Sequence, residues 1–306
     1  MRDKPFSVYA MAIGPIVLWG GTPIANKVAV AVIDPATAGL LRSAIAAVLA
    51  ALLAIAMRLP WPSDSRQRWL LVFSGLTSFA GWPLALSLGL GLTTASHAAL
   101  IIAMIPVVTG LIAAATDRTW PPPTWWAGSA IAALGTAILI GVRPIDGVGP
   151  ESSLAGDLVV LVGVVACAAG YVAGGKLSPV IGTWATTFWG LGSAAVVLVP
   201  AVVALWGRTD WTAVGSLEWL AVGYMALISS LLGYIGWFWA LGRGGITQMS
   251  AWQLGQPVIT LALAVLLLGE VLTWPAIVSG VAIVAGIALT QRRQRARAAA
   301  PGLPAE

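Results

Sequence analysis

Residues 69–116 read WLLVFSGLTSFAGWPLALSLGLGLTTASHAALIIAMIPVVTGLIAAAT, which is 48 consecutive positions without Asp, Glu, Lys or Arg. A helix crosses a hydrocarbon core of about 30 Å with about 20 apolar residues, so this stretch is too long for a single crossing. The glycine-rich segment GLGLTT at 89–94 supplies a break. We therefore expect two membrane-spanning helices, one on either side of that segment.

The composition of the whole chain agrees with a membrane protein. Of its 306 residues, 59% are hydrophobic and 9% are charged, whereas a soluble domain carries about 25% charged residues. A soluble enzyme or nucleic-acid-binding protein is therefore excluded. The single cysteine, Cys167, and the single histidine, His97, exclude a disulfide framework and a Cys/His metal cluster. No cofactor or metal is expected.

The gaps between charged residues predict eight further crossings, which makes ten in total. They cover residues 5–26, 35–57, 119–142, 157–176, 181–205, 217–240, 246–268 and 274–290.

The basic residues give the orientation of these spans. With ten spans, both termini and the loops after the even-numbered spans lie on one side, which collects twelve of the sixteen Lys and Arg residues. The opposite side has only Arg143 and Arg208, while Lys27 and Arg42 lie within spans. By the positive-inside rule, both termini are cytoplasmic and the protein lies in the inner (plasma) membrane.

A linker rich in Gly, Pro and acidic residues, 142–156, divides the chain into two halves of five spans, 1–141 and 157–290. A basic tail, 291–306, follows and is interpreted as a cytoplasmic segment near anionic lipid rather than a nucleic-acid site. Because five is odd, the halves have opposite orientations. We therefore expect an all-α membrane protein with ten transmembrane helices arranged as two inverted five-helix repeats.

Residues of the same type recur at equivalent positions in the two halves, with nearly constant spacing. Lys27 and Lys176 lie 149 residues apart, and Pro106 and Pro257, both deep in a span, lie 151 residues apart. Inverted repeats with interrupted helices and a midplane site are typical of secondary transporters. The alternative is that helical membrane sequences look alike because Gly, Ala and Leu are abundant in all of them.

These residues form a pattern that resembles the drug/metabolite transporter superfamily, in its EamA-type ten-helix branch. Short motifs in a specific order carry the resemblance: Trp19-Gly20, Lys27, Arg42, Pro106, Pro257 and Gly269-Glu270. The resemblance covers nearly the whole chain apart from the tails, and within the branch the chain looks like the YddG-type exporters of aromatic amino acids.

Four charged residues at span ends are candidate gating residues. The predicted topology places Lys27 and Glu270 toward the outer side, and Asp117 and Lys176 toward the cytoplasmic side. Each pair joins opposite halves, so we expect two contacts that form alternately. The alternative is that each lysine extends to its interface and each acid is solvated.

No carboxylate is predicted at mid-span, where ion-coupled carriers commonly place one. His97, near the outer start of span four, is the one side chain whose ordinary pKa of about 6.5 suits proton sensing. A histidine at a helix end also serves as an interfacial hydrogen-bonding group. We therefore expect movement down the substrate's own gradient without tight ion coupling.

Six of the sixteen tryptophans fall within spans, where an indole N–H needs a partner or a wet cavity. With other interior aromatics and a polar face on span nine, they are candidates to line a cavity, although core or lipid-facing packing is the alternative for each. The candidate substrate-binding residues are Trp19, Thr22, Phe79, Trp82, His97, Tyr171, Tyr234, Trp237, Trp252, Gln253 and Gln256.

The resemblance and the interior aromatics together predict an alternating-access exporter of small amphipathic metabolites, first of all aromatic and other neutral amino acids. A carrier for another solute (a nucleoside, amine or drug) and a passive channel are the alternatives. No motif of an intramembrane enzyme is present in the sequence. The expected partners are a small-molecule substrate and the lipid bilayer, with no nucleic acid. A monomer is expected, with a dimer as the alternative.

Overall fold

The computed structural model describes residues 6–141, 153–246, 249 and 251–299, and every regular element within these ranges is helical. The elements up to residue 141 are α1 (Phe6–Gly20), α2 (Thr22–Val30), α3 (Pro35–Ala56), α4 (Ser65–Gly75), the π-helix η1 (Leu76–Gly81), α5 (Trp82–Leu90), α6 (Ala95–Ile102), α7 (Ile105–Asp117) and α8 (Pro123–Gly141). Those after residue 153 are α9 (Leu154–Ile181), α10 (Thr183–Leu205), η2 (Trp206–Arg208), α11 (Ser216–Gly223), the π-helix η3 (Tyr224–Leu232), α12 (Gly233–Gly244), η4 (Ala251–Leu254), α14 (Gly255–Leu268) and α15 (Trp274–Ala299).

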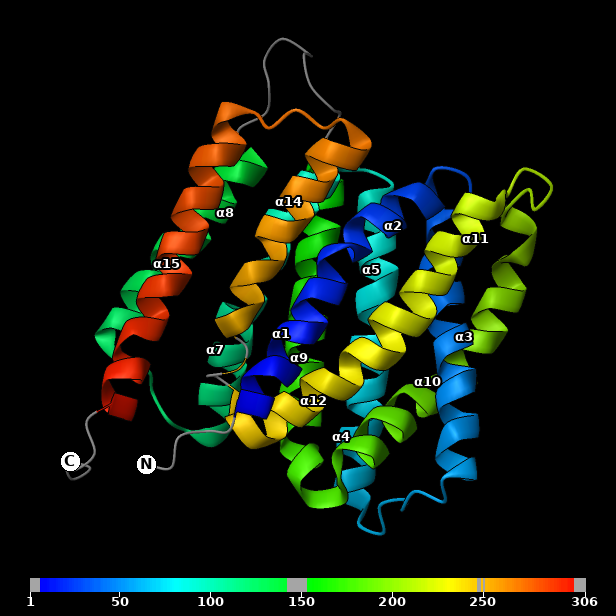
Figure 1. Ribbon diagram of the computed structural model, residues 1–306, viewed down its shortest axis with the longest axis horizontal. Helices are drawn as coiled ribbons and strands as arrows, with labels where there is room; N and C mark the ends of the chain where they lie inside the picture. Colours follow the sequence, from blue (N-terminus) through cyan, green and yellow to red (C-terminus); the bar gives the residue numbers. More distant parts are fainter. Residues whose placement is uncertain (1–5, 142–152, 247–248, 250, 300–306) are drawn as a thin grey trace.

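The helices run side by side between two ends of a bundle (Figure 1). In the described residues, six helical stretches are long and apolar enough to cross a membrane: Pro35–Ala56, Ser65–Leu90, Ala95–Asp117, Leu154–Ile181, Thr183–Arg208 and Ser216–Gly244. The predicted break in the stretch 69–116 is confirmed, because α5 ends at Leu90 and α6 begins at Ala95.

Short polar side chains fix where several helices begin. Asp34 accepts a hydrogen bond from the backbone N–H of Thr37 at the start of α3, and Thr94 does the same for His97 at the start of α6. Ser153 accepts from the N–H of Gly156 at the start of α9. Each cap satisfies a donor that the first helical turn would otherwise leave without a partner.

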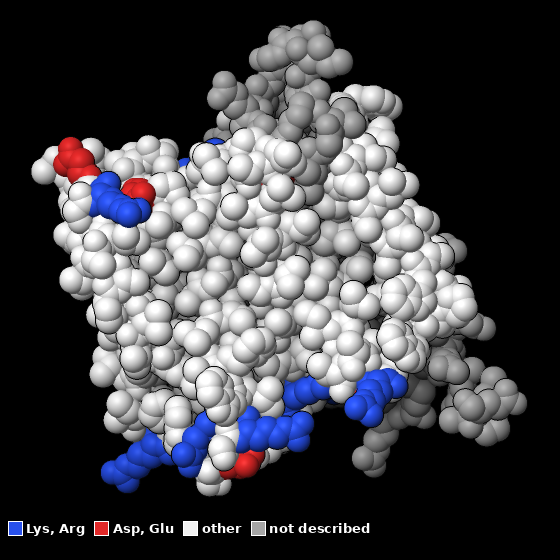
Figure 2. Space-filling model, turned by 180° about the vertical axis from the view of Figure 1, so that it is seen from behind, with Lys and Arg blue, Asp and Glu red and all other residues white. Residues whose placement is uncertain are grey.

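The outer surface of the bundle is apolar. Val196 and Leu266 are 78% and 76% exposed, and Figure 2 shows a broad surface without charged residues above a lower edge lined with Lys and Arg. A soluble monomer rarely exposes so much contiguous apolar surface, whereas lipid covers it without cost.

The largest helix–helix contacts join the two parts of the chain. α3 packs against α10, α8 against α15, α1 against α12, and α5 against α9. Small residues allow the close approaches. At Gly75, where α4 ends, an added Cβ would lie 2.3 Å from the carbonyl oxygen of Gly190 in α10. The core is therefore the seam between the parts before and after the linker.

Two long helical stretches contain a π-helix in their interior. η1 interrupts Ser65–Leu90, and η3 interrupts Ser216–Gly244. π-Helical segments are rare and occur often at functional sites. Here they bring Ser78 and the pair Ser229-Ser230 to buried positions at the seam.

Candidate functional site

A cavity lies at the seam, between elements drawn from both parts of the chain. Its lining combines aromatic rings, hydroxyl groups, an amide and one guanidinium: Trp19, Thr22, Pro23, Arg42, Trp82, Pro83, Leu86, Ile105, Tyr171, Ser229, Ser230, Tyr234 and Gln256. The cavity leaves about 20 Å³ for the centres of water-sized molecules, within about 410 Å³ of unfilled space that includes its open mouth. A mostly apolar cleft with a few convergent polar groups is the usual form of a small-molecule site.

Trp19 is the centre of the aromatic wall. Its ring stacks on Tyr171 with 6.1 Å between centroids, and meets Tyr234 and Trp237 edge-on at 5.1 and 5.4 Å. Phe79 in turn meets Tyr234 edge-on at 4.4 Å. The structure therefore brings together five of the aromatic residues that the sequence singles out, from α1, η1, α9 and α12.

A break between α1 and α2 supplies polar groups beside this wall. α1 ends at Gly20 and α2 begins at Thr22, which leaves carbonyl groups without helical partners. The Thr260 hydroxyl donates to the Gly20 oxygen at 2.7 Å, and the Gln256 amide donates to the Trp19 oxygen at 3.5 Å. α14 thus closes the gap in this broken helix.

Ser229, on η3, links the broken helix to the second part of the chain. Its backbone oxygen accepts from the indole N–H of Trp19 at 2.9 Å, and its hydroxyl lies 2.9 Å from that of Thr22. Consecutive serines in an otherwise apolar span were the available sequence signal for Ser229 and Ser230, but the sequence analysis missed both.

Other predicted residues lie around the cavity rather than in its lining. Phe79 and Trp237 pack behind Trp19 and Tyr234, and Trp252 packs against the core while remaining partly exposed. Gln253 is buried and donates to the Tyr171 hydroxyl at 3.5 Å. Trp82, in contrast, lies in the cavity lining.

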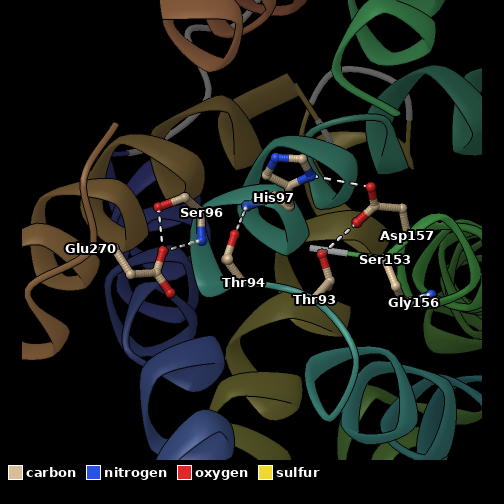
Figure 3. A network of polar contacts seen from close by, with 8 residues as sticks. All are labelled: Thr93, Thr94, Ser96, His97, Ser153, Gly156, Asp157 and Glu270. Carbon is tan, nitrogen blue, oxygen red and sulfur yellow. Dashed lines mark hydrogen bonds and ion pairs between the residues drawn. The ribbon is translucent and has the colours of Figure 1, made fainter. Parts of the chain in front are cut away.

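His97 is not in the cavity lining. It lies in the polar network around the first turn of α6 (Figure 3). Its Nδ1 is 3.1 Å from an oxygen of Asp157, whose other oxygen accepts from the Thr93 hydroxyl at 2.6 Å. Asp157 is fully buried. The sequence analysis used this residue only as a span boundary and missed the network.

Glu270 approaches the same helical turn from the other side (Figure 3). Its carboxylate accepts from the backbone N–H groups of Ala95 and Ser96 at 2.8 and 2.9 Å, and from the Ser96 hydroxyl at 2.6 Å. A carboxylate at a helix N-terminus is stabilised by unpaired N–H groups and by the helix dipole. Two acids from the second half of the chain therefore hold the start of α6.

Lys27 and Glu270, the pair expected to form in alternation with the inner pair, form no ion pair with each other in this structure. The Lys27 ammonium instead donates to the backbone oxygens of Leu90 and Thr93, both at 2.8 Å. Both charged groups therefore hold the segment between α5 and α6, from different sides. The carbonyl groups that bind Lys27 in place of the Glu270 carboxylate lie in a turn, and their position could not be predicted from the spacing of residues in the sequence.

The second expected pair is formed. The Lys176 ammonium lies 2.5 Å from the Asp117 carboxylate and donates to the Thr116 hydroxyl at 2.8 Å. The two side chains are 32% and 51% exposed. This contact joins the end of α7 to α9 at the end of the bundle that holds the termini (Figure 1).

Arg42 is the lining residue whose role the sequence analysis left open. The sequence shows it as a charge within the second predicted span, outside the candidate binding residues. The structure places it in the cavity wall, 2% exposed. Within the described residues, no three His, Cys, Asp or Glu side chains gather in a way that could hold a metal ion.

Comparison with known proteins agrees with this architecture. The model of the EamA-like transporter family matches residues 6–141 and, a second time, residues 154–292. A solved crystal structure with 22% sequence identity superposes with a TM-score of 0.64 over 95% of this chain and 98% of that one, which shows a shared fold.

Two bacterial relatives are also transporters by name. The chain is 31% identical to the uncharacterized transporter YdeK of Bacillus subtilis over 92% of this chain and 95% of that protein. It is 26% identical to a probable terminal-alkyne amino-acid exporter of Streptantibioticus cattleyicolor over 76% and 77% of the two chains. The chain belongs to the EamA-like transporter family and is a multi-pass membrane transporter, not an enzyme.

Proposed function

We propose that this transporter exports small amphipathic metabolites, first of all aromatic and other neutral amino acids. The observation that carries the proposal is the cavity at the seam, where aromatic rings face hydroxyl groups and a guanidinium. Stacked rings suit a planar apolar side chain, and the polar groups suit an amino-acid backbone. The relative named as a probable amino-acid exporter supports this choice. A nucleoside, amine or drug is the second candidate.

The proposed architecture has ten spans in two inverted repeats, 1–141 and 157–290. The family model matches each half separately, which supports the repeat. The packing supports a two-fold relation between the halves. Such a relation turns the contact of span one with span eight into a contact of span six with span three, and both occur, as α1 with α12 and as α9 with α5.

The proposed orientation places both termini in the cytoplasm and the protein in the plasma membrane. Figure 2 supports it, because Lys and Arg gather along one edge of the surface, the edge at which the termini lie in Figure 1. Positive residues favour the cytoplasmic side. The protein is proposed to work as a monomer in the bilayer, with no nucleic-acid partner.

The proposed mechanism is alternating access, with a gate at each end of the cavity. The inner gate is the contact between Asp117 and Lys176. The outer gate is the first turn of α6, which Glu270 and Asp157 hold from the second half. An exposed pair contributes only about 0–1 kcal/mol, so the inner contact can open without trapping the protein.

The test is reconstitution of the full chain into liposomes with a panel of amino acids. The proposal expects saturable uptake of labelled phenylalanine, competition by tryptophan, and counterflow from preloaded vesicles. Uptake without saturation or counterflow would indicate a channel. Strong stimulation by an imposed pH gradient would contradict transport without tight ion coupling.

A further inference from the structure

The guanidinium of Arg42 is buried without hydrogen-bond partners for two of its nitrogens. Neither Nε nor Nη1 has a partner among the residues that the structure describes, and the side chain is 2% exposed. Arginine does not lose its proton in proteins, so the charge persists. A buried charge is costly unless it is paired. The position therefore calls for an anion that the protein itself does not provide.

The cavity offers a direction from which such an anion can approach, because Arg42 is part of its wall. The described lining residues include no Asp or Glu. The guanidinium presents parallel donors, and the group that matches them best is a carboxylate or phosphate. The cavity is lined mainly by aromatic and aliphatic side chains, with no second basic residue in the described lining. A single guanidinium beside apolar rings favours a monovalent carboxylate over a phosphate.

The same lining lacks a charged partner for a substrate ammonium group. Its remaining polar groups, such as Thr22, Ser229 and Gln256, are neutral. An α-amino group would find hydroxyl and carbonyl oxygens and aromatic faces, whereas the carboxylate would find a full opposite charge. Recognition should therefore depend on the carboxylate much more than on the amino group.

We propose that Arg42 binds the carboxylate of the substrate and that the protein selects organic carboxylates with an aromatic or apolar tail, with the amino group optional. This inference rests on the proposed transport function and names the feature of the substrate that the site reads.

The experiment compares three probes of matched size: phenylalanine, 3-phenylpropionate and phenethylamine. Competition against labelled phenylalanine is measured in proteoliposomes, and thermal stabilisation of the purified full-length protein is measured independently. We expect the two carboxylates to compete with labelled phenylalanine and to raise the melting temperature of the protein, and phenethylamine to do neither. Arg42→Gln should weaken the apparent affinity for both carboxylates about 10- to 100-fold. Arg42→Lys, which keeps the charge, should weaken this affinity less.

The matched control is Arg66→Gln, which makes the same chemical change at an exposed arginine in the first turn of α4. It should leave affinity and melting temperature unchanged. In the absence of ligand, Arg42→Gln should melt no lower than the wild type, because it removes an unpaired buried charge. A melting temperature that falls by many degrees without ligand would show a structural role for Arg42 and overturn the inference.

Two outcomes separate this inference from the proposed function. If the protein exchanges all three probes equally and Arg42→Gln changes nothing, carboxylate selection is wrong while transport stands. If no probe is exchanged but 3-phenylpropionate stabilises only proteins that keep Arg42, the transport proposal fails while the carboxylate site stands. An equal Arg42-dependent stabilisation by sodium chloride alone would assign the site to an inorganic counter-ion and overturn the proposal.

Discussion

Replacing Glu270 by Gln should loosen the start of α6 and open the outer end of the cavity more often. The carboxylate accepts three hydrogen bonds there, two from backbone N–H groups and one from the Ser96 hydroxyl. Glutamine keeps the shape but loses the charge. A charge-assisted hydrogen bond exceeds a neutral one by about 1 kcal/mol, and the interaction with the helix dipole adds about 0.3–1 kcal/mol. Since Glu270 is partly exposed, we expect the substitution to weaken this contact by about 2 kcal/mol. That shifts the equilibrium between the closed and the open outer end about 30-fold toward the open form.

The assay uses a cysteine at Leu86, which is buried in the cavity wall, in a background in which Cys167, the single cysteine of the chain, is replaced by Ala. The rate of modification by a membrane-impermeant thiol reagent added from outside reports how often the outer end opens. We expect Glu270→Gln to raise this rate at least 10-fold. Glu218→Gln, at the start of α11 on the same end of the bundle, is the control and should leave the rate unchanged. An unchanged rate in folded Glu270→Gln protein would refute the assignment of this contact as a gate.

Three further substitutions test other parts of the site. Reversing the charge of either Asp117 or Lys176 should lower exchange several-fold, and reversing both charges together should restore it. The melting temperature should change little, because the pair is exposed. A double variant that exchanges as slowly as either single variant would contradict this. Asp157→Asn should destabilise the protein by about 1–3 kcal/mol, because it weakens buried hydrogen bonds to Thr93 and His97, as measured by thermal unfolding in detergent; an unchanged transition would be inconsistent with the network. Trp19→Ala should weaken competition by tryptophan at least 10-fold while Trp19→Phe retains most of it, since ring stacking on Tyr171 and substrate needs an aromatic face; equal affinities in both variants would place the substrate elsewhere.

Six of the ten predicted spans correspond, within the described residues, to helical stretches long and apolar enough to cross a membrane, because hydrophobic length determines them. The break before Ala95 follows from 48 uncharged residues that no single helix can span. The clustering of Trp19, Tyr171, Tyr234 and Trp237 also followed from the sequence, since a large aromatic side chain in the interior of a span faces either lipid or the seam. Here the seam holds all four.

The polar contacts could be predicted only where topology left few choices. Asp117 and Lys176 sit at span ends on the same side, and the structure joins them. Lys27 and Glu270 met the same condition, but each found backbone partners in the segment around Thr93, and those partners depend on how a turn folds. A helix N-terminus offers free N–H groups that compete with a lysine for a carboxylate.

Other features depend on tertiary packing and could not be predicted from the sequence. Asp157 and His97 are 60 residues apart and meet because α6 packs against α9. The two π-helices carry no pattern that distinguishes them from α-helix, yet η3 determines where Ser229 and Ser230 lie. Arg42 carried a signal, as a charge within a span, but its missing partners are visible only in the folded chain.

We propose that two inverted copies of a five-helix unit enclose the cavity between them. It is tested most directly by attaching compartment-sensitive reporters to the amino terminus, to the linker at Gly147 and to the carboxyl terminus of the full chain in cells. With inverted repeats, both termini should report the cytoplasm and the linker should report the outside. Termini on opposite faces of the membrane, or a linker on the same face as the termini, would contradict it.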